Sequence, residues 1–169
     1  KKLFKFYKPD FVFHLAAQAL VRKSYISPIE TYHSNTIGTL NILESLRVLK
    51  KKCAVVLITS DKVYKNIETN KGYKENDVLG GKDPYSGSKV AAENIIASYL
   101  NSFFDGKKSK ILICVARAGN VIGGGDWSSD RIIPDCVKSW SKNKIPKIRN
   151  PNSTRPWQHV LEAVGGYLV

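Results

Sequence analysis

Tyr85 and Lys89 stand four residues apart, directly after a turn marked by Asp83 and Pro84. The segment that follows, residues 86–104, is rich in helix formers and carries apolar side chains at helical spacing, which predicts a helix. Residues four apart share one face of a helix, so the Lys89 ammonium is expected beside the Tyr85 phenol. A neighbouring cation lowers a tyrosine pKa from about 10, which would make Tyr85 a base. The alternative is a half-buried aromatic beside a solvated lysine.

A second group of reactive side chains follows an apolar, β-branched run at residues 55–58. Such a run predicts a buried parallel strand. Directly after it come two hydroxyls, a carboxylate and an amine, on Thr59, Ser60, Asp61 and Lys62. Open α/β sheets bind ligands at the carboxyl ends of their strands, where these side chains would lie. The alternatives are capping of the strand end by the hydroxyls and an ordinary Asp61–Lys62 ion pair.

Strands and helices alternate along the chain. The patterns predict strands at residues 10–15, 54–59, 110–116 and 146–149, and helices at 30–49, 85–104, 132–140 and from 159 onward. A polar loop, residues 65–84, joins the second strand to the second helix. This order predicts an α/β fold built on a doubly wound parallel sheet.

Composition limits the classes of partner. The net charge of +13 would suit nucleic acid, but the basic residues are scattered and cluster only at Lys50–Lys52 and Lys107–Lys108. We therefore expect no nucleic-acid partner. No apolar run approaches the roughly 18 residues of a membrane span, so we expect no membrane partner. Cys53, Cys114 and Cys136 are widely spaced, which indicates reduced thiols in a cytoplasmic protein and no metal site.

Five stretches in a characteristic order carry a family resemblance. They are His14–Gln18 (HLAAQ), Thr59–Tyr64, Gly72–Lys89, Arg117–Pro134 and Arg155–Val160. With these residues the chain resembles the extended short-chain dehydrogenase/reductase family. Within that family it is similar to the nucleotide-sugar 4,6-dehydratases, most closely to the branch that acts on CDP-glucose.

The resemblance implies a Rossmann-like sheet that binds NAD. Residues 1–122 would be the C-terminal part of the NAD-binding domain, and residues 123–169 the start of a smaller, interleaved substrate-binding region. No glycine fingerprint for a pyrophosphate precedes Asp10, and Gly123–Gly125 follows a later strand. We therefore expect a fragment of a protein about twice as long, lacking the first β-α-β unit or units and the end of the substrate domain, and inactive by itself.

The implied reaction oxidises a hexose at C4, eliminates water across C5 and C6, and returns the hydride to C6. By resemblance, Tyr85 takes the C4 hydroxyl proton, while Lys89 lowers the Tyr85 pKa and binds the nicotinamide ribose. Ser60, together with Thr59, would hold the C4 oxygen. Such positioning and proton transfer are established sources of rate.

The elimination is expected to use Asp61 and Lys62 as acid and base. The lysine matches the CDP-glucose branch, whereas the dTDP-glucose branch has glutamate at that position. Simple epimerases of the family usually carry small uncharged residues at both positions. The pair can work if Lys62 is neutral, and Asp61 protonated, for part of the time.

Further residues receive binding roles by resemblance. Cofactor contacts are expected from Ala16, Ala17, Gln18, Thr59, Asn120, Tyr85 and Lys89. Substrate contacts are expected from Thr59, Arg117, Asn120, Arg131, Arg149 and Arg155, the last three for the diphosphate because guanidinium groups suit phosphate oxygens. Asn35 matches a structural and proton-relay asparagine of the wider family.

The implied partners are a nucleotide-sugar, most closely CDP-glucose, and a second copy of the chain. Helices 30–49 and 85–104 would form a homodimer, with Leu43, Leu46, Ile96 and Leu100 as partial candidates for its surface, although some of them must face the sheet instead. A role in making the deoxysugars of lipopolysaccharide O-antigen would follow. The rivals are a nucleotide-sugar 4-epimerase, a dehydratase acting on a dTDP- or UDP-sugar, and an inactive or purely binding module.

Overall fold

The computed structural model describes residues 1–105 and 109–169, which divide into two compact units, Lys1–Ala118 and Gly119–Val169. The assignment of residues 1–122 to cofactor binding and 123–169 to substrate binding stays a prediction, because these units are defined by contacts within the chain. Among the described residues, no helix combines the length and the apolar character needed to cross a membrane.

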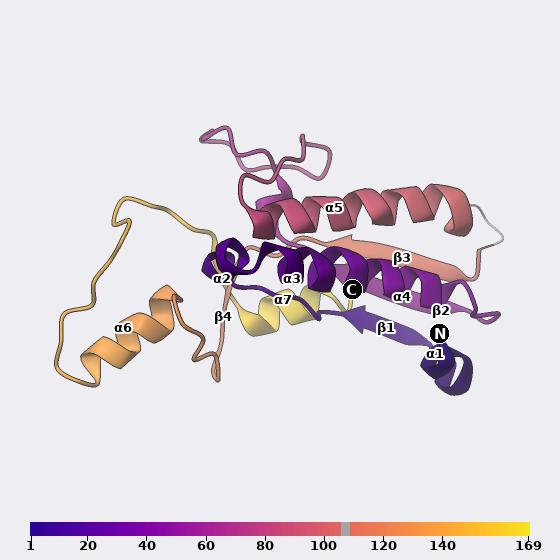
Figure 1. Cartoon of the computed structure of the whole chain (residues 1–169), viewed down its shortest axis with the longest axis horizontal. Coiled ribbons are helices and arrows are strands. Elements are labelled where there is room, and N and C mark those ends of the chain that lie inside the picture. The colour runs from indigo at the N-terminus through magenta and orange to yellow at the C-terminus, as the bar shows by residue number, and fades with distance from the viewer. Residues whose placement is uncertain (106–108) are drawn as a thin grey trace. The chain divides into compact units, whose positions relative to one another are not determined.

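A three-stranded parallel sheet forms the centre of the first unit (Figure 1). Its order is β1 (Phe11–His14), β2 (Cys53–Ile58) and β3 (Ile111–Ala116). In register, Val55 of β2 lies between Val12 of β1 and Ile113 of β3. This confirms the predicted α/β fold with a parallel sheet. The apolar, β-branched β2 is the central strand, as its sequence indicates.

Helices connect these strands. Helix α1 (Lys2–Tyr7) precedes β1, and the β1–β2 connection contains α2 (Val21–Ile26), α3 (Pro28–Tyr32), the π-helical turn η1 (His33–Ile37) and α4 (Gly38–Leu46). The β2–β3 connection contains the 3₁₀ turn η2 (Asp61–Val63), α5 (Pro84–Tyr99) and the π-helical turn η3 (Leu100–Phe104). The helix predicted over 30–49 is present, because α3, η1 and α4 follow one another without a break up to Leu46, and only the turn η1 within it is π-helical. Asn35 and Thr36 of η1 bond across to Ser88 of α5.

The core lies between the sheet and the layer of α4 and α5, which run next to each other (Figure 1). Alternate residues of β2 point into it. They meet the completely or almost completely buried Leu43, Leu46 and Ile96, whose exposed fractions are 0%, 0% and 1%. Of the partial candidates for a dimer surface, these three side chains therefore face the sheet, and burying each stabilises the fold by about 1.5–3 kcal/mol.

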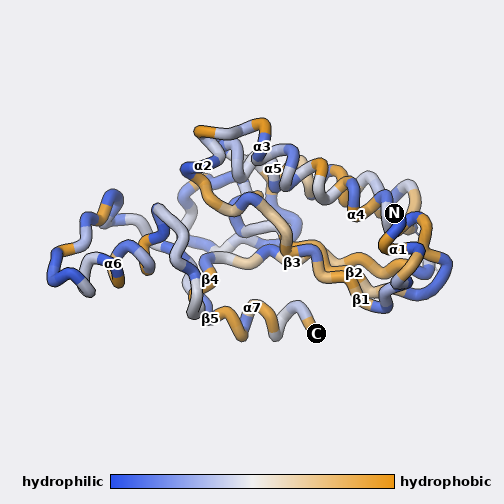
Figure 2. Tube along the Cα trace, turned by 60° about the horizontal axis from the view of Figure 1, so that its bottom comes forward, coloured by the Kyte–Doolittle hydropathy of each residue, from blue (hydrophilic) through white to orange (hydrophobic). Residues whose placement is uncertain are grey.

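The other face of the sheet is also apolar. Figure 2 shows the strands of the first unit in the colours of hydrophobic residues. Phe11, Phe13 and Leu112 are 68%, 42% and 68% exposed. Strands with apolar residues on both faces are typical of sheets that are covered on both sides.

The second unit contains a two-stranded parallel sheet and two helices. The elements are β4 (Asn120–Ile122), α6 (Ile132–Trp140), β5 (Trp157–His159) and α7 (Val160–Gly166). The predicted helix at 132–140 is confirmed, whereas the predicted strand at 146–149 is wrong. That segment contains Pro146, which has no N–H to donate, and its neighbour Ile145 is 96% exposed. The strand that pairs with β4 lies instead at β5.

Truncation of Leu43 tests the position of the core. We expect Leu43→Ala to lower the free energy of unfolding by about 2–5 kcal/mol, because the side chain is completely buried and leaves a cavity. The measurement is urea unfolding followed by circular dichroism. Leu161→Ala, at a position that is 71% exposed, is the control and should change stability by less than about 0.5 kcal/mol. Equal effects of the two variants would contradict this core.

Candidate active site

Helix α5 starts at a defined residue because Asp83 caps its first turn. Asp83 Oδ1 accepts a hydrogen bond from the Ser86 backbone N–H at 3.0 Å, and the Ser86 hydroxyl completes a capping box. Pro84 follows the cap, a position where a missing N–H costs nothing. The cap places Tyr85 and Lys89 in the first two turns of the helix. Their exposed fractions are only 8% and 6%.

The Lys89 ammonium lies at the carboxyl end of β2. Its Nζ donates to the carbonyl oxygen of Ile58, the last residue of that strand, at 3.2 Å. Burial lowers the Lys89 pKa to about 8, so the cationic form still predominates at neutral pH. Burial, followed by the charge of Lys89, also lowers the pKa of His14, which keeps that imidazole neutral. Lys89 is therefore a cation on the same face of α5 as the Tyr85 phenol.

The turn η2 brings three further side chains to this end of β2. Ser60 caps the turn by accepting a hydrogen bond from the Lys62 backbone N–H at 3.2 Å. Its hydroxyl also donates to Asp61 Oδ1 at 3.0 Å. Lys62 Nζ lies 3.3 Å from the same carboxylate oxygen, and the Asp61 and Lys62 side chains are partly exposed, at 28% and 34%. Asp61 and Lys62 thus form a reachable ion pair, next to a hydroxyl that is buried.

Thr59 contacts Glu93, a residue for which the sequence predicted no role. Its hydroxyl donates to Glu93 Oε1 at 2.6 Å, and Glu93 is itself 7% exposed. Arg117, expected to bind the sugar, makes a two-point ion pair with the same carboxylate through Nε and Nη2. Glu93 lies four residues beyond Lys89, so the regular spacing of Tyr85, Lys89 and Glu93 on one helix face could have identified Glu93 from the sequence.

A buried amide network joins the loop after β1 to the start of α5. Asn35 Oδ1 accepts from the Gln18 backbone N–H at 2.8 Å, and Asn35 Nδ2 donates to the Gln18 carbonyl oxygen at 3.1 Å and to Ser88 Oγ at 2.9 Å. The Ser88 hydroxyl donates to the Tyr85 carbonyl oxygen at 2.6 Å. The Tyr85 backbone N–H in turn donates to Ser24 Oγ at 3.1 Å. Nothing in the sequence pattern marked Ser24 or Ser88 for this role.

The loop after β1 also borders a cavity of about 410 Å³. Ala16 and Ala17 line it with methyl groups alone, so a ligand could approach the backbone closely. The Gln18 side chain is used within the protein, since its Nε2 donates to Thr31 Oγ1 at 2.9 Å. Its backbone N–H and carbonyl are likewise bonded to Asn35, so the expected contact of Gln18 with a cofactor stays a prediction.

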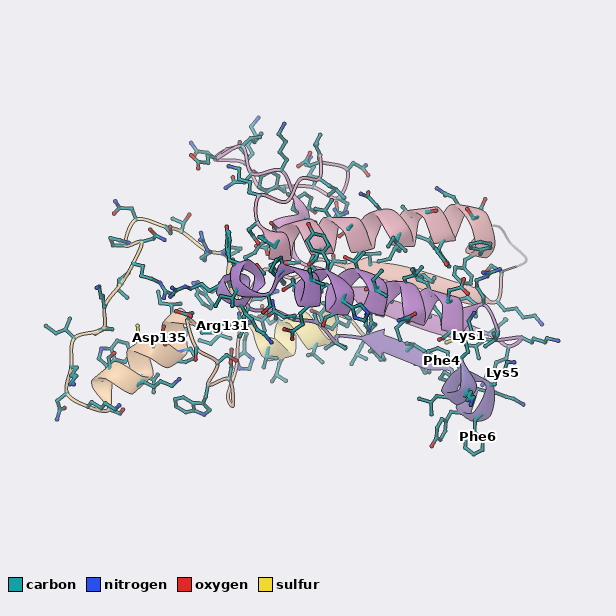
Figure 3. The ribbon with its side chains drawn as sticks, viewed as in Figure 1. Lys1, Phe4, Lys5, Phe6, Arg131 and Asp135 are labelled. Atoms are coloured by element: carbon teal, nitrogen blue, oxygen red, sulfur yellow. The ribbon has the colours of Figure 1, made fainter. Side chains whose placement is uncertain are left out.

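The remaining predicted residues lie in the second unit. The Asn120 backbone N–H donates to the Pro156 carbonyl oxygen at 2.9 Å. Figure 3 labels Arg131 at the start of α6. Three arginines have local partners: Arg131 lies 3.8 Å from Asp126, Arg149 lies 2.6 Å from Asp130, and Arg155 donates to the Thr154 carbonyl oxygen at 2.7 Å. Their role in binding a diphosphate, like that of Asn120, stays a prediction.

Comparison with known families places the chain among nucleotide-sugar enzymes. The profile of the family described as GDP-mannose 4,6 dehydratase matches residues 1–168. The CDP-glucose 4,6-dehydratase of Salmonella typhimurium is 52% identical over 166 residues, which are 96% of this chain and 46% of that protein. The chain thus spans about half the length of the curated relatives that it matches.

Solved structures show the same fold. The structure of Pal from Bacillus thuringiensis is 26% identical, with a TM-score of 0.86 over 99% of this chain and 52% of that one. UDP-glucuronic acid 4-epimerase from Bacillus cereus, solved with UDP-glucuronic acid and NAD, has a TM-score of 0.83. It is 23% identical and covers 99% of this chain and 50% of its own, and it supports the fold alone.

Removing the Asn35 amide tests the buried network. Asn35→Ala should lower the free energy of unfolding by about 1–3 kcal/mol, because it leaves a buried N–H of Gln18 and the Ser88 hydroxyl with fewer partners. Asn94→Ala, at an exposed position on α5, is the matched control and should be nearly neutral. Thermal and urea unfolding would measure both. A neutral Asn35→Ala would mean that the network does not hold the loop against α5.

Proposed function

Because the chain belongs to the GDP-mannose 4,6 dehydratase family, we propose that its protein is an NAD-dependent hydro-lyase that removes water from a nucleotide-activated hexose. The proposed substrate is CDP-glucose and the product its 4-keto-6-deoxy derivative. The observation that supports the proposal is the position of Lys89, which donates to the last carbonyl of β2, with Tyr85 one turn earlier on α5 and the Asp61–Lys62 pair on η2 directly after the same strand. The choice of CDP-glucose is supported by the 52% identical relative.

The residues at this end of the sheet fit a nicotinamide cofactor. Ala16 and Ala17 border the cavity with small side chains, and Lys89 presents a buried ammonium that can donate to ribose hydroxyls. When bound, NAD supplies a hydride acceptor for C4 and a hydride donor for C6. The protein supplies positioning and proton transfer around those steps.

Tyr85 is the proposed base for the C4 hydroxyl. The Lys89 cation favours the phenolate, which accepts the hydroxyl proton as the hydride leaves C4. The Ser60 hydroxyl would donate a hydrogen bond to the developing C4 carbonyl oxygen. Because the cap at Asp83 fixes the first turn of α5, the phenol does not have to be reordered for each turnover.

Asp61 and Lys62 are proposed to run the elimination as one unit. The ion pair holds a single proton between a carboxylate and an amine 3.3 Å away. Transfer of that proton from Lys62 to Asp61 produces a neutral base and a neutral acid together. Lys62 can then take the C5 proton, made acidic by the C4 ketone, while Asp61 protonates the C6 hydroxyl, which leaves as water.

Two variants test whether oxidation and elimination use different residues. In the protein produced from its complete gene, Tyr85→Phe should lose both steps, by about 10²–10⁴ in rate, because the C4 proton has no acceptor. Lys62→Ala should still remove the C4 hydride, seen as reduced-nicotinamide absorbance in a single turnover, but release little deoxy product.

Wild-type protein should act on CDP-glucose in preference to dTDP- and UDP-glucose. Deoxy product formed by Lys62→Ala at the wild-type rate, or epimerised rather than dehydrated sugar from wild type, would contradict the dehydratase assignment.

We also propose a homodimer formed by the outer faces of α4 and α5. Leu43, Leu46 and Ile96 are buried, so the candidates lie in the π-helical turns that adjoin these helices: Ile37 of η1 is 38% exposed and Phe103 of η3 is 49% exposed. Sedimentation of the complete protein at micromolar concentration should give the mass of two chains. Ile37→Lys combined with Phe103→Lys should shift the equilibrium toward monomer, because two charges per chain would need burial. A wild-type monomer at these concentrations would refute the proposal.

A further inference from the structure

Glu93, which is buried, and Arg117, which is partly buried, form an ion pair one helical turn beyond Lys89. Arg117 Nε donates to Glu93 Oε1 at 2.8 Å and Nη2 donates to Oε2, while Thr59 Oγ1 donates to Oε1 at 2.6 Å. The two side chains are 7% and 18% exposed. The hydrogen bonds to Glu93 raise the Arg117 pKa above its ordinary value, so the guanidinium stays charged. The carboxylate thus connects α5 to the ends of both β2 and β3.

The rest of the guanidinium connects this pair to the segment that follows η2. Arg117 Nη1 donates to Tyr64 Oη at 3.0 Å and to the Glu75 carbonyl oxygen at 2.9 Å. The guanidinium carbon lies 4.9 Å from the centre of the Tyr64 ring, and that ring stacks on Tyr73 at 5.0 Å. Tyr64 is the residue directly after η2, which carries Asp61 and Lys62.

We infer that Glu93 and Arg117 are positioning residues that hold the two reactive pairs in one arrangement, and that Arg117 does not bind the sugar. A guanidinium has five N–H donors, and this one uses Nε once, Nη2 once and Nη1 twice within the protein. A sugar ligand would have to compete with a buried carboxylate, a phenol and a backbone carbonyl. The inference rests on the proposed function, because it assigns α5 to the oxidation and η2 to the elimination.

The pair also sets the local electrostatic field. Together the two groups are neutral. Glu93 alone would be an unpaired charge about 12 Å along α5 from Tyr85, and Arg117 alone would leave a positive charge next to that position. A lone Glu93 carboxylate disfavours the Tyr85 phenolate, and a lone Arg117 cation favours it. At an effective dielectric constant of about 20, a charge at that distance shifts a pKa by about half to one unit.

Other charged and titratable groups on the elements around Tyr85 and Lys89 also contribute to the electrostatic potential at Tyr85. They remain the same in every variant, so they do not affect the difference between variants. These groups are His14, Arg22, Tyr32, Asp61, Lys62 and the Lys23–Glu30 ion pair.

A double-mutant cycle in the protein from its complete gene separates positioning from substrate binding. The variants are Glu93→Gln, Arg117→Gln and the two combined. For each variant, kcat, KM and the acid limb of the pH dependence of kcat/KM are measured with CDP-glucose as substrate. Asp10→Asn with Lys51→Gln removes an exposed ion pair and is the matched control, expected to match wild type in all three.

We expect the acid limb to move to higher pH in Arg117→Gln and to lower pH in Glu93→Gln, each by about half to one unit. In the double variant it should return to within about 0.3 unit of wild type, since no buried charge is left unpaired. In Arg117→Gln, kcat should fall about tenfold or more, with KM changed less than about threefold. A change in stability alone would not move the acid limb in opposite directions.

A substrate ligand would behave differently. If Arg117 binds the sugar, KM should rise about tenfold or more in both Arg117→Gln and the double variant, with the acid limb unmoved, and this result would overturn the inference. If a single variant does not fold, the double variant still decides, because only a ligand role predicts a raised KM in it. Failure of the proposed function has its own signature, namely wild-type protein that makes no deoxy product. If wild-type protein is an epimerase, the same double-mutant cycle can be measured on the epimerisation.

Discussion

The docking of α5 on the carboxyl end of β2 is the constraint on which the site depends. One face of this helix changes character along its length. Its first turns carry Tyr85, Lys89 and Glu93, and its later turns carry Ile96 into the apolar core. The apolar part supplies the burial energy, and the polar part must then find partners where it lies. Lys89 finds the carbonyl oxygen of Ile58, and Glu93 finds Thr59 and Arg117.

The segments around this end of the sheet are irregular, yet their polar groups are satisfied by side chains. Asn35 bonds both the N–H and the carbonyl of Gln18, as a neighbouring strand would. Ser24 and Ser88 hold the two backbone groups of Tyr85. An unpaired buried polar group costs about 1–3 kcal/mol, so each of these bonds selects one loop conformation over others. The rigidity that the proposed catalysis needs would therefore come from specific hydrogen bonds as well as from regular elements.

Charge is arranged differently in the two parts of the site. Lys89 is buried and bonded to a neutral carbonyl, whereas Asp61 and Lys62 form a partly exposed pair. The first arrangement suits a constant positive charge beside a phenol, and the second suits the proton transfer of the proposed elimination. The Glu93–Arg117 pair lies beside them without adding net charge. That neutrality lets a buried carboxylate lie close to Lys89 without cancelling its effect on Tyr85.

The sequence by itself determined the features that depend on neighbouring residues. Strand β2, helix α5 and the shared face of Tyr85 and Lys89 follow from local periodicity and capping, and the structure has them where the sequence predicts. Only the tertiary structure decided the π-helical turn η1, the pairing of β4 with β5, and the hydrogen-bond partners of the Arg117 guanidinium. Arg117 contacts residues 24, 53 and 42 positions away, so no local pattern could show that its guanidinium was already occupied. Guanidinium groups bind substrate carboxylates and protein carboxylates with the same geometry, and only the packing of α5 against the sheet settles which one is near.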